Sequence, residues 1–216
     1  MPSKRINIPQ NPKPPDAIAI QNKLASLVSQ RSELPKLLRY IAGADVAYDN
    51  ERASGAAVLI AYDTLEHIET ATAKARTTFP YIPGLLSFRE GPVAVRAVHK
   101  LKHRPDVCIV DGHGLAHPRR FGLACYVGLI MNLPTIGVAK SRLFGIDNGE
   151  MLLDPEGNLI AAVLQHNKKN LYVSVGHKIS LEDATRIVKH CITGRGLEPV
   201  LLAHQESRRL KWSTKT

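Results

Sequence analysis

Cysteine is scarce in this 216-residue sequence and is not arranged in pairs. The three cysteines, Cys108, Cys125 and Cys191, are odd in number, scattered, and without any Cys-x-x-Cys spacing. Neither a disulfide framework nor a cysteine-rich zinc site is therefore supported, and we expect a reduced, cytoplasmic setting.

Long apolar runs are also missing. None approaches the roughly 20 residues that a membrane-spanning helix needs, and the polar, proline-rich N-terminus has no apolar signal core. Internal repeats and low-complexity linkers are absent as well. Because this length suits one sizeable core, we expect a single domain over 1–216, monomeric and not bound to membranes, with a loose arm at 1–14.

Acidic residues are outnumbered by basic ones. Lysine and arginine total 29 against 19 aspartates and glutamates, which gives a formal net charge of +10. Such a balance favours a polyanionic partner such as nucleic acid. A basic surface without a partner is the alternative, and charge alone does not decide between them.

The apolar pattern predicts strands and helices in an informative order. We expect strands at 40–48, 56–61, 68–79, 107–110, 134–139, 159–165 and 171–175, and helices at 15–31, 92–103, 119–131, 180–191 and from 201 onward. Three strands followed by helix, strand, helix and strand indicate an α/β or α+β domain of three layers, with a mixed central sheet flanked by helices.

Two aspartates lie in or at the end of apolar strands. Asp45 is within the first predicted strand, and Asp111 directly follows Val107–Val110. A buried carboxylate is costly unless it is paired or bound to metal, and strand ends of an open sheet converge on one crevice. Glu90 would add a third oxygen ligand of the kind that Mg²⁺ prefers. The alternatives are an ion pair for Asp45, a turn for Asp111 before a glycine, and a helix-dipole contact for Glu90.

Two pairs of histidines have a spacing of four, which on a helix can place both imidazoles on one metal. Gly114 between His113 and His117 argues against a regular helix there. His99 and His103 lie beside lysines and are typical of a solvated helix face. A zinc site is therefore disfavoured at both.

A short segment, Phe79-Pro-Tyr-Ile-Pro-Gly84, places an aromatic residue between two prolines. Pro80 and Pro83 fix their φ angles, so the loop is expected to be stiff. A stiff loop that exposes Tyr81 can push into a base stack at low entropic cost. Packing of the aromatic at the base of the loop is the alternative.

Together these segments resemble the endonuclease V family over almost the whole chain. The resemblance rests on Phe79–Gly84 followed by Arg89-Glu-Gly91, on Val110–Pro118 and on Asp45. It implies a ribonuclease-H-like fold and metal-dependent nicking of nucleic acid near deaminated purines such as inosine. The bond cut would be the second phosphodiester 3′ to the lesion, which stays in the strand.

The resemblance also implies residue roles. The expected metal ligands, for Mg²⁺ or Mn²⁺ in its place, are Asp45, Glu90 and Asp111, assisted in catalysis by Lys140 and His204. The expected DNA wedge is Pro80, Tyr81, Ile82 and Pro83, and the expected base pocket is Gly84, Leu86, Gly112, His113, Gly114 and His117. The sequence departs from the family at His113, where many relatives carry Gln or Asn, and at Leu201-Leu202, where a Thr-Arg pair is usual.

The partner expected from this resemblance is double-stranded DNA that contains a deaminated base, with single-stranded DNA or inosine-containing RNA as further candidates. Three rival functions remain open: an inosine-specific endoribonuclease, a non-catalytic nucleic-acid-binding module on the same fold, and a generic ribonuclease-H-like nuclease. The aromatic loop would have no clear role in the last of these.

Overall fold

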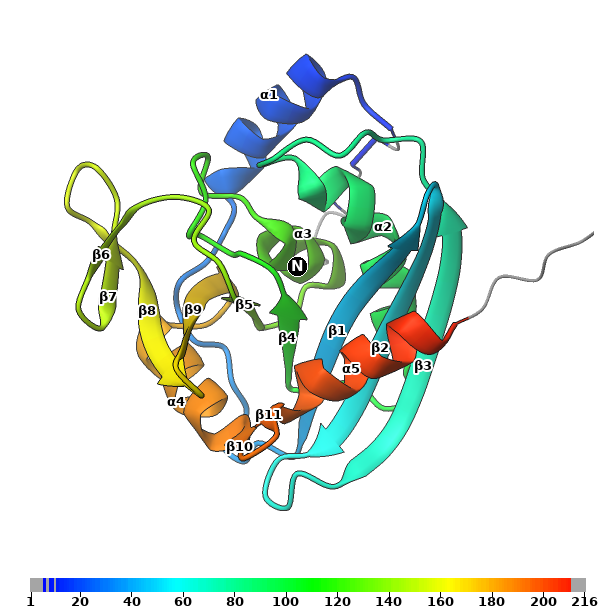
Figure 1. The fold of residues 1–216 in the computed structure, drawn as a ribbon, viewed down its shortest axis with the longest axis vertical. Helices are drawn as coiled ribbons and strands as arrows, with labels where there is room; N and C mark the ends of the chain where they lie inside the picture. Colours follow the sequence, from blue (N-terminus) through cyan, green and yellow to red (C-terminus); the bar gives the residue numbers. More distant parts are fainter. Residues whose placement is uncertain (1–5, 7, 10, 211–216) are drawn as a thin grey trace, which may run out of the picture.

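A computed structural model describes residues 6, 8, 9 and 11–210 of the chain. Its centre is a nine-stranded mixed sheet with the strand order β3-β2-β1-β4-β5-β9-β8-β7-β6 (Figure 1). The strands are β1 (Tyr40–Asp49), β2 (Arg52–Ala61), β3 (His67–Arg76), β4 (Val107–Asp111), β5 (Thr135–Ala139), β6 (Ile146–Asn148), β7 (Met151–Leu153), β8 (Leu159–His166) and β9 (Lys169–His177). A separate small ribbon pairs β10 (Ile192–Thr193) with β11 (Gly196–Leu197).

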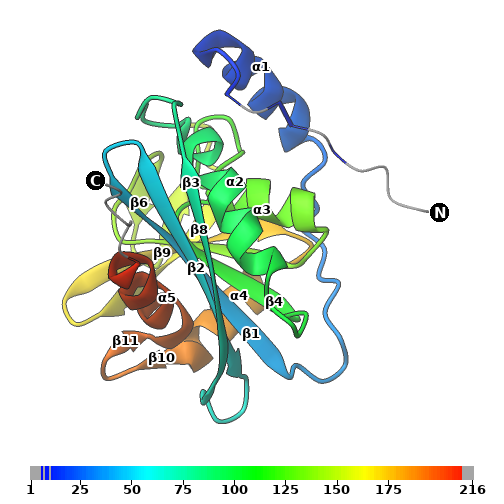
Figure 2. The ribbon, with the colours of Figure 1, turned by 90° about the vertical axis from the view of Figure 1, so that its right-hand side faces the viewer.

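Helices cover both faces of the sheet. The helices are α1 (Pro14–Ala25), α2 (Leu86–His99), α3 (Leu123–Met131), α4 (Leu181–Cys191) and α5 (Glu198–Arg209). Figure 2 shows α2 and α3 on one side of β1 and β2, with α5 on the other. This mixed sheet between helical layers confirms the predicted α/β class, and its layout is ribonuclease-H-like.

The central strands are buried on both faces. In β4, Ile109 belongs to the apolar cluster that includes Val200 of α5, whereas Val110 packs in the cluster that includes Val93 and Leu123 from the opposite layer. Alternating burial of this kind follows from the period of two along a strand. It explains why β4 is an uninterrupted apolar run that ends in one carboxylate.

Strand register brings the two aspartates together. β1 and β4 are parallel and pair Ala44 with Val110, so Asp45 and Asp111 are the next residue on each strand. Gly43, two residues before Asp45, lets α5 approach this face, because a Cβ there would lie 2.0 Å from the Pro199 carbonyl oxygen. The backbone alone therefore places both carboxylates under α5.

Two predicted helix starts are wrong. α2 begins at Leu86 rather than at Pro92, which lies inside the helix. Burial of Phe88 in the core stabilises the additional residues at the start of the helix. As the seventh helical residue, Pro92 cannot donate the usual backbone hydrogen bond to the carbonyl four residues before it. α3 begins at Leu123 rather than at Arg119, because the preceding segment is non-helical and Arg120 has a φ of 52°.

The predicted end of the first helix at 31 is also wrong, because α1 ends at Ala25, whereas the predicted cap of α4 is confirmed. Ser180 caps α4 by accepting a hydrogen bond from the backbone N–H of Asp183 at 3.1 Å, as the sequence pattern indicated. The hairpin of β6 and β7 was not predicted. Much of the loose arm expected at 1–14 lies outside the described residues, and α1 begins at Pro14. In the part of the chain that the structure describes, no helix is long and apolar enough to cross a membrane.

Candidate active site

Three potential ligand groups meet where β1 and β4 pass beneath α5. One oxygen from each of Asp45 and Asp111 and one ring nitrogen of His204 all lie within 4.8 Å of one another. Asp45 is only 9% exposed, whereas Asp111 and His204 are half-buried. The structure therefore brings together two predicted metal ligands and one predicted catalytic histidine from three distant segments.

Asp45 is held by two side chains of α5. Its Oδ2 accepts a hydrogen bond from Ser207 Oγ at 2.7 Å and lies 3.1 Å from His204 Nδ1. His204 and Ser207 are three residues apart, which puts them on the same helix face. Asp45 has a hydroxyl and an imidazole as partners in place of the lysine or arginine of the alternative prediction. These two groups orient its carboxylate.

Glu90, the third predicted metal ligand, lies on α2 and is not one of the three groups within 4.8 Å of one another, but the charges of both aspartates act on it. The pKa of Glu90 is raised to about 8, by burial first and then by the charges of Asp45 and Asp111, while Arg89 opposes the shift. Ionisation of Glu90 near these two carboxylates is therefore costly unless a cation is bound. Hard oxygen donors are also the ligands that Mg²⁺ and Mn²⁺ favour. The donor set and its electrostatics therefore fit a divalent metal ion.

Lys140 comes directly after β5 and reaches the edge of this cluster. Its Nζ lies 2.8 Å from Asp111 Oδ2, and its side chain is largely exposed. An exposed ion pair of this kind contributes little to stability. The lysine is thus placed to hold a phosphate or water beside the carboxylates at no large structural cost.

The aromatic loop lies between β3 and α2. Tyr81 is 71% exposed, and both flanking prolines, Pro80 and Pro83, are also exposed, whereas Ile82 is half-buried. Phe79, one residue before the loop's first proline, is in contrast buried in the core. The packing alternative for Tyr81 is therefore not what the structure shows.

A pocket with a volume of about 190 Å³ opens beside this loop. It is lined by the wedge residues Tyr81, Ile82 and Pro83, by the predicted Gly84, Leu86, Gly112, His113 and His117, and by Ser87, Gly122, Leu123, Ser141, Arg142 and Leu143. A cavity of about 150 Å³ already holds a benzene ring, so the space suits a planar heterocycle. Gly114 instead packs against β9, where a Cβ would lie 2.0 Å from the Val175 carbonyl oxygen.

The two pocket histidines are both largely buried and uncharged near neutral pH. Burial lowers the pKa of His113 and of His117 to about 4. His117 Nδ1 accepts from the Arg119 backbone N–H at 3.1 Å, so its Nε2 carries the proton and donates to the Gly84 carbonyl at 2.9 Å. His117 thus holds the end of the loop through Nε2, while its Nδ1 binds the backbone of Arg119. His113 Nδ1 is buried with no hydrogen-bond partner among the described residues.

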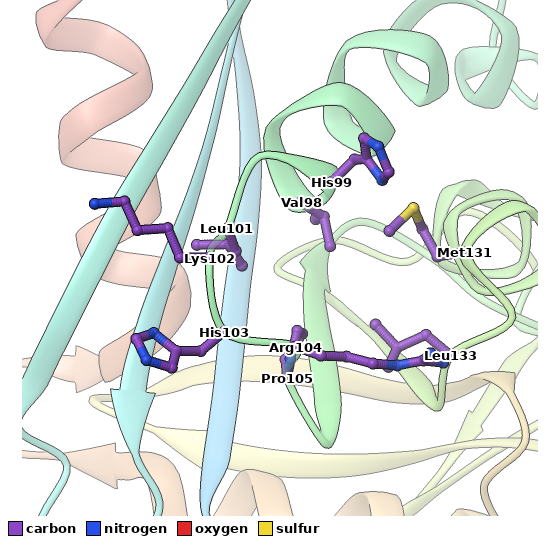
Figure 3. A pocket seen from close by; sticks show the side chains of 9 residues that line it. All are labelled: Val98, His99, Leu101, Lys102, His103, Arg104, Pro105, Met131 and Leu133. Atoms are coloured by element: carbon purple, nitrogen blue, oxygen red, sulfur yellow. The ribbon is translucent and has the colours of Figure 1, made fainter.

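The second histidine pair lies elsewhere. His99 and His103 line a cavity of about 300 Å³ near the start of β4, whereas Asp111 is at that strand's other end. Figure 3 shows their imidazoles on different sides of this cavity. His103 Nδ1 lies 3.2 Å from a Glu69 carboxylate oxygen. The structure thus gives no support to a shared metal there.

Several residues at the site were not predicted. They are Gln21, Ser207, Arg119, Ser141, Arg142 and Leu143. Ser207 had a usable signal, because it follows His204 by three positions on a predicted helix. The segment 141–143 had no such signal in the sequence, because only the path of the chain after β5 brings it to the pocket.

Fold and site together define a ribonuclease-H-like nuclease. The endonuclease V family profile matches residues 22–205. An endonuclease V of Desulfurococcus amylolyticus is 39% identical over 198 residues, covering 88% of this chain and 90% of that one. This chain belongs to the endonuclease V family, and it is an endonuclease.

Solved structures agree. Endonuclease V of Streptomyces avermitilis superposes with a TM-score of 0.83 at 34% identity, covering 95% of this chain and 96% of that one. Ciona intestinalis endonuclease V superposes with a TM-score of 0.81 at 28% identity over 90% of this chain and 95% of that one. The Ciona protein was solved with a 24mer DNA that contains an inosine followed by a ribo-adenosine.

Proposed function

We propose that this protein is a DNA repair endonuclease that recognises deaminated purines, deoxyinosine above all, and hydrolyses a phosphodiester bond 3′ to the lesion. The family resemblance assigns the second bond and leaves the lesion in the nicked strand. One observation carries the proposal: the pocket beside the exposed aromatic loop is lined by Gly112 and His113, which directly follow Asp111 of the carboxylate cluster. The inosine-containing DNA bound by the Ciona relative supports the choice of substrate.

In this proposal Asp45, Glu90 and Asp111 hold Mg²⁺, or Mn²⁺ in its place. When bound, the ion supplies a nucleophilic water and stabilises the charge of the leaving oxygen. His204 orients Asp45 through its Nδ1. Lys140, whose Nζ donates to Asp111, is available to hold the attacked phosphate.

Recognition precedes this chemistry. The deaminated purine rotates out of the duplex into the pocket, and Tyr81 fills the space it leaves in the stack. A mispaired inosine unpairs at lower energy than a normal base, which supplies part of the selectivity. Gly84 and Gly112, at positive φ angles of 79° and 153°, let the main chain approach the base closely.

End-labelled duplexes with and without one deoxyinosine test this proposal, assayed in Mg²⁺ and in EDTA. We expect the deoxyinosine duplex to give one product, nicked on the 3′ side of the lesion, in Mg²⁺ but not in EDTA. Single-stranded DNA and inosine-containing RNA of the same sequence complete the series. Preferential cutting of the RNA would make the protein an endoribonuclease, and equal cutting of plain duplex would make it a generic nuclease.

A further inference from the structure

The wedge loop, residues 79–84, is anchored at both ends through its backbone carbonyls. At the first end, the Arg89 guanidinium donates to the Phe79 carbonyl and also to the Asn50 carbonyl at 3.0 Å. At the other end, Arg119 Nη2 donates to the Gly84 carbonyl at 2.7 Å. Hydrogen bonds at Phe79 and at Gly84 therefore fix the two ends of the loop, and the exposed residues lie between them.

More side chains take part at the second end of the loop, around the Gly84 carbonyl. The Gly84 carbonyl also accepts hydrogen bonds from Gln21 Nε2 at 3.0 Å and from His117 Nε2 at 2.9 Å. Gln21 lies on α1, 63 positions before Gly84, and its side chain is wholly buried. Helix α1 is thus linked to the loop by a polar contact rather than by apolar packing alone.

The chemistry at this point requires an amide at position 21. Gln21 Oε1 accepts from Arg119 Nε at 2.6 Å, while its Nε2 donates to Gly84 and to the Phe121 carbonyl at 2.9 Å. A guanidinium only donates and a carbonyl only accepts, so the group between them must do both. A carboxylate would repel the two carbonyls. An apolar side chain would deprive Arg119 Nε and the Phe121 carbonyl of the partner they have in Gln21 and would leave the Gly84 carbonyl with two donors in place of three.

We propose that Gln21 is a positioning residue for lesion recognition, which ties α1 to the wedge loop through Arg119 and the Gly84 carbonyl and so sets where Tyr81 stands. The inference rests on the proposed function of the loop. A fully satisfied buried polar network specifies one arrangement, whereas a partly satisfied one does not. Loss of Gln21 should therefore loosen the loop without touching the carboxylates.

Gln21→Leu tests the inference, because it keeps most of the side-chain volume and removes both the oxygen and the nitrogen of the amide. We expect the ratio of affinities for inosine and plain duplex to fall about tenfold, a size typical of substitutions that act on a site through intervening residues. KM for inosine duplex should rise, and kcat at saturating substrate should stay within about twofold. Hydrogen exchange in peptides that span residues 79–88 should become faster.

Leu24→Ala is the matched control. Leu24 lies on the same helix and is also buried, but it takes no part in the polar network. This variant should lower the melting temperature and keep the affinity ratio. Should Gln21→Leu fail to fold, Gln21→Asn, an amide one methylene shorter, carries the same measurements.

Two results would overturn the inference: an unchanged affinity ratio with unchanged exchange in the Gln21 variant, or an equal loss of the ratio in Leu24→Ala. A wild-type protein that does not distinguish inosine from plain duplex would instead contradict the proposed function. In that case the exchange measurement still decides whether Gln21 holds the loop.

Discussion

The carboxylate cluster and the wedge loop lie close together but are positioned by different means. Asp45 and Asp111 are fixed by the register of two buried parallel strands, so their separation is a property of the backbone. Tyr81 stands on a loop whose ends are held by side-chain donors from Gln21, Arg89, His117 and Arg119. The position of the carboxylates thus depends on the sheet, and the position of the wedge loop depends on a few side-chain hydrogen bonds.

This difference separates chemistry from recognition. Groups on strands are held more precisely than groups on loops, which suits a metal site that tolerates little displacement. A wedge must move between base pairs, so a loop that is stiff but separately anchored suits its task. Substitutions in the carboxylate cluster should therefore change nicking and keep lesion selectivity. Substitutions in the wedge loop should change lesion selectivity and keep the chemistry of nicking.

The largest expected effect comes from the cluster. Asp111→Asn should reduce nicking by well over a hundredfold, because even groups that only support a metal ligand cost about 10–100-fold when removed. Affinity for inosine duplex should stay within about threefold, measured in Ca²⁺ or EDTA by fluorescence anisotropy. Near-normal turnover in Mg²⁺ would remove Asp111 from the metal site, and a parallel loss of affinity would break the separation.

Glu90 predicts a pH effect confined to the cluster. Its pKa in the folded protein is raised from 4.5 to about 8, so the folded state holds a proton that the unfolded state releases. The stabilisation is complete below pH 4.5 and is lost as pH rises toward 8. Since metal binding must displace this proton, apparent Mg²⁺ affinity should rise about tenfold per pH unit up to about pH 8.

Calorimetry without metal measures how stability depends on pH, and titration with Mg²⁺ measures how the apparent Mg²⁺ affinity depends on pH. Glu90→Gln should flatten both profiles between pH 5 and 8, roughly the interval between the two pKa values. The ratio of affinities for inosine and plain duplex should show no matching change over this interval. An Mg²⁺ affinity independent of pH in the wild type would mean that Glu90 is already ionised.

Tyr81→Ala should affect the other region. Stacking of one aromatic on a base contributes about 1–3 kcal/mol, so selective affinity for inosine duplex should fall roughly five- to a hundredfold. Metal affinity and melting temperature should be unchanged, because the side chain is mostly exposed. Tyr81→Phe keeps the ring and should keep the selectivity. Equal ratios in Tyr81→Ala and the wild type would assign recognition to the pocket alone.

The sequence predicted the cluster better than the loop's support, for a physical reason. An apolar run that ends in aspartate already implies a buried strand and a convergent carboxylate. The stiffness of the wedge loop also follows from its prolines. Its anchors join positions up to 63 residues apart, and neither composition nor spacing encodes a hydrogen bond over that distance.

One trace of these anchors was nevertheless present. Buried residues of α1 fall at Ala17, Gln21 and Leu24, so a glutamine occupies the apolar stripe of the helix. A polar residue in such a stripe must find partners inside the protein. The start of α2 was misplaced because Pro92 was read as a first-turn residue, while the burial of Phe88 could be known only from tertiary packing.

The smallest expected effect tests the support of Asp45. Ser207 Oγ is one of two α5 groups that hold the Asp45 carboxylate, and His204 remains when it is lost. Ser207→Ala should therefore raise the Mg²⁺ concentration for half-maximal nicking about tenfold, the lower end for an outer group at a metal site. The rate at saturating Mg²⁺ should recover to near wild type, because no metal ligand has been removed.

Glu206→Ala is the control for Ser207→Ala on the same helix. Glu206 pairs with Arg209 at 2.7 Å on the surface of α5, and a pair of this kind contributes little. Its Mg²⁺ requirement should match the wild type, and both variants should keep full inosine selectivity. A loss of selectivity in Ser207→Ala would show that the orientation of Asp45 reaches the wedge loop, so that chemistry and recognition are not separately built.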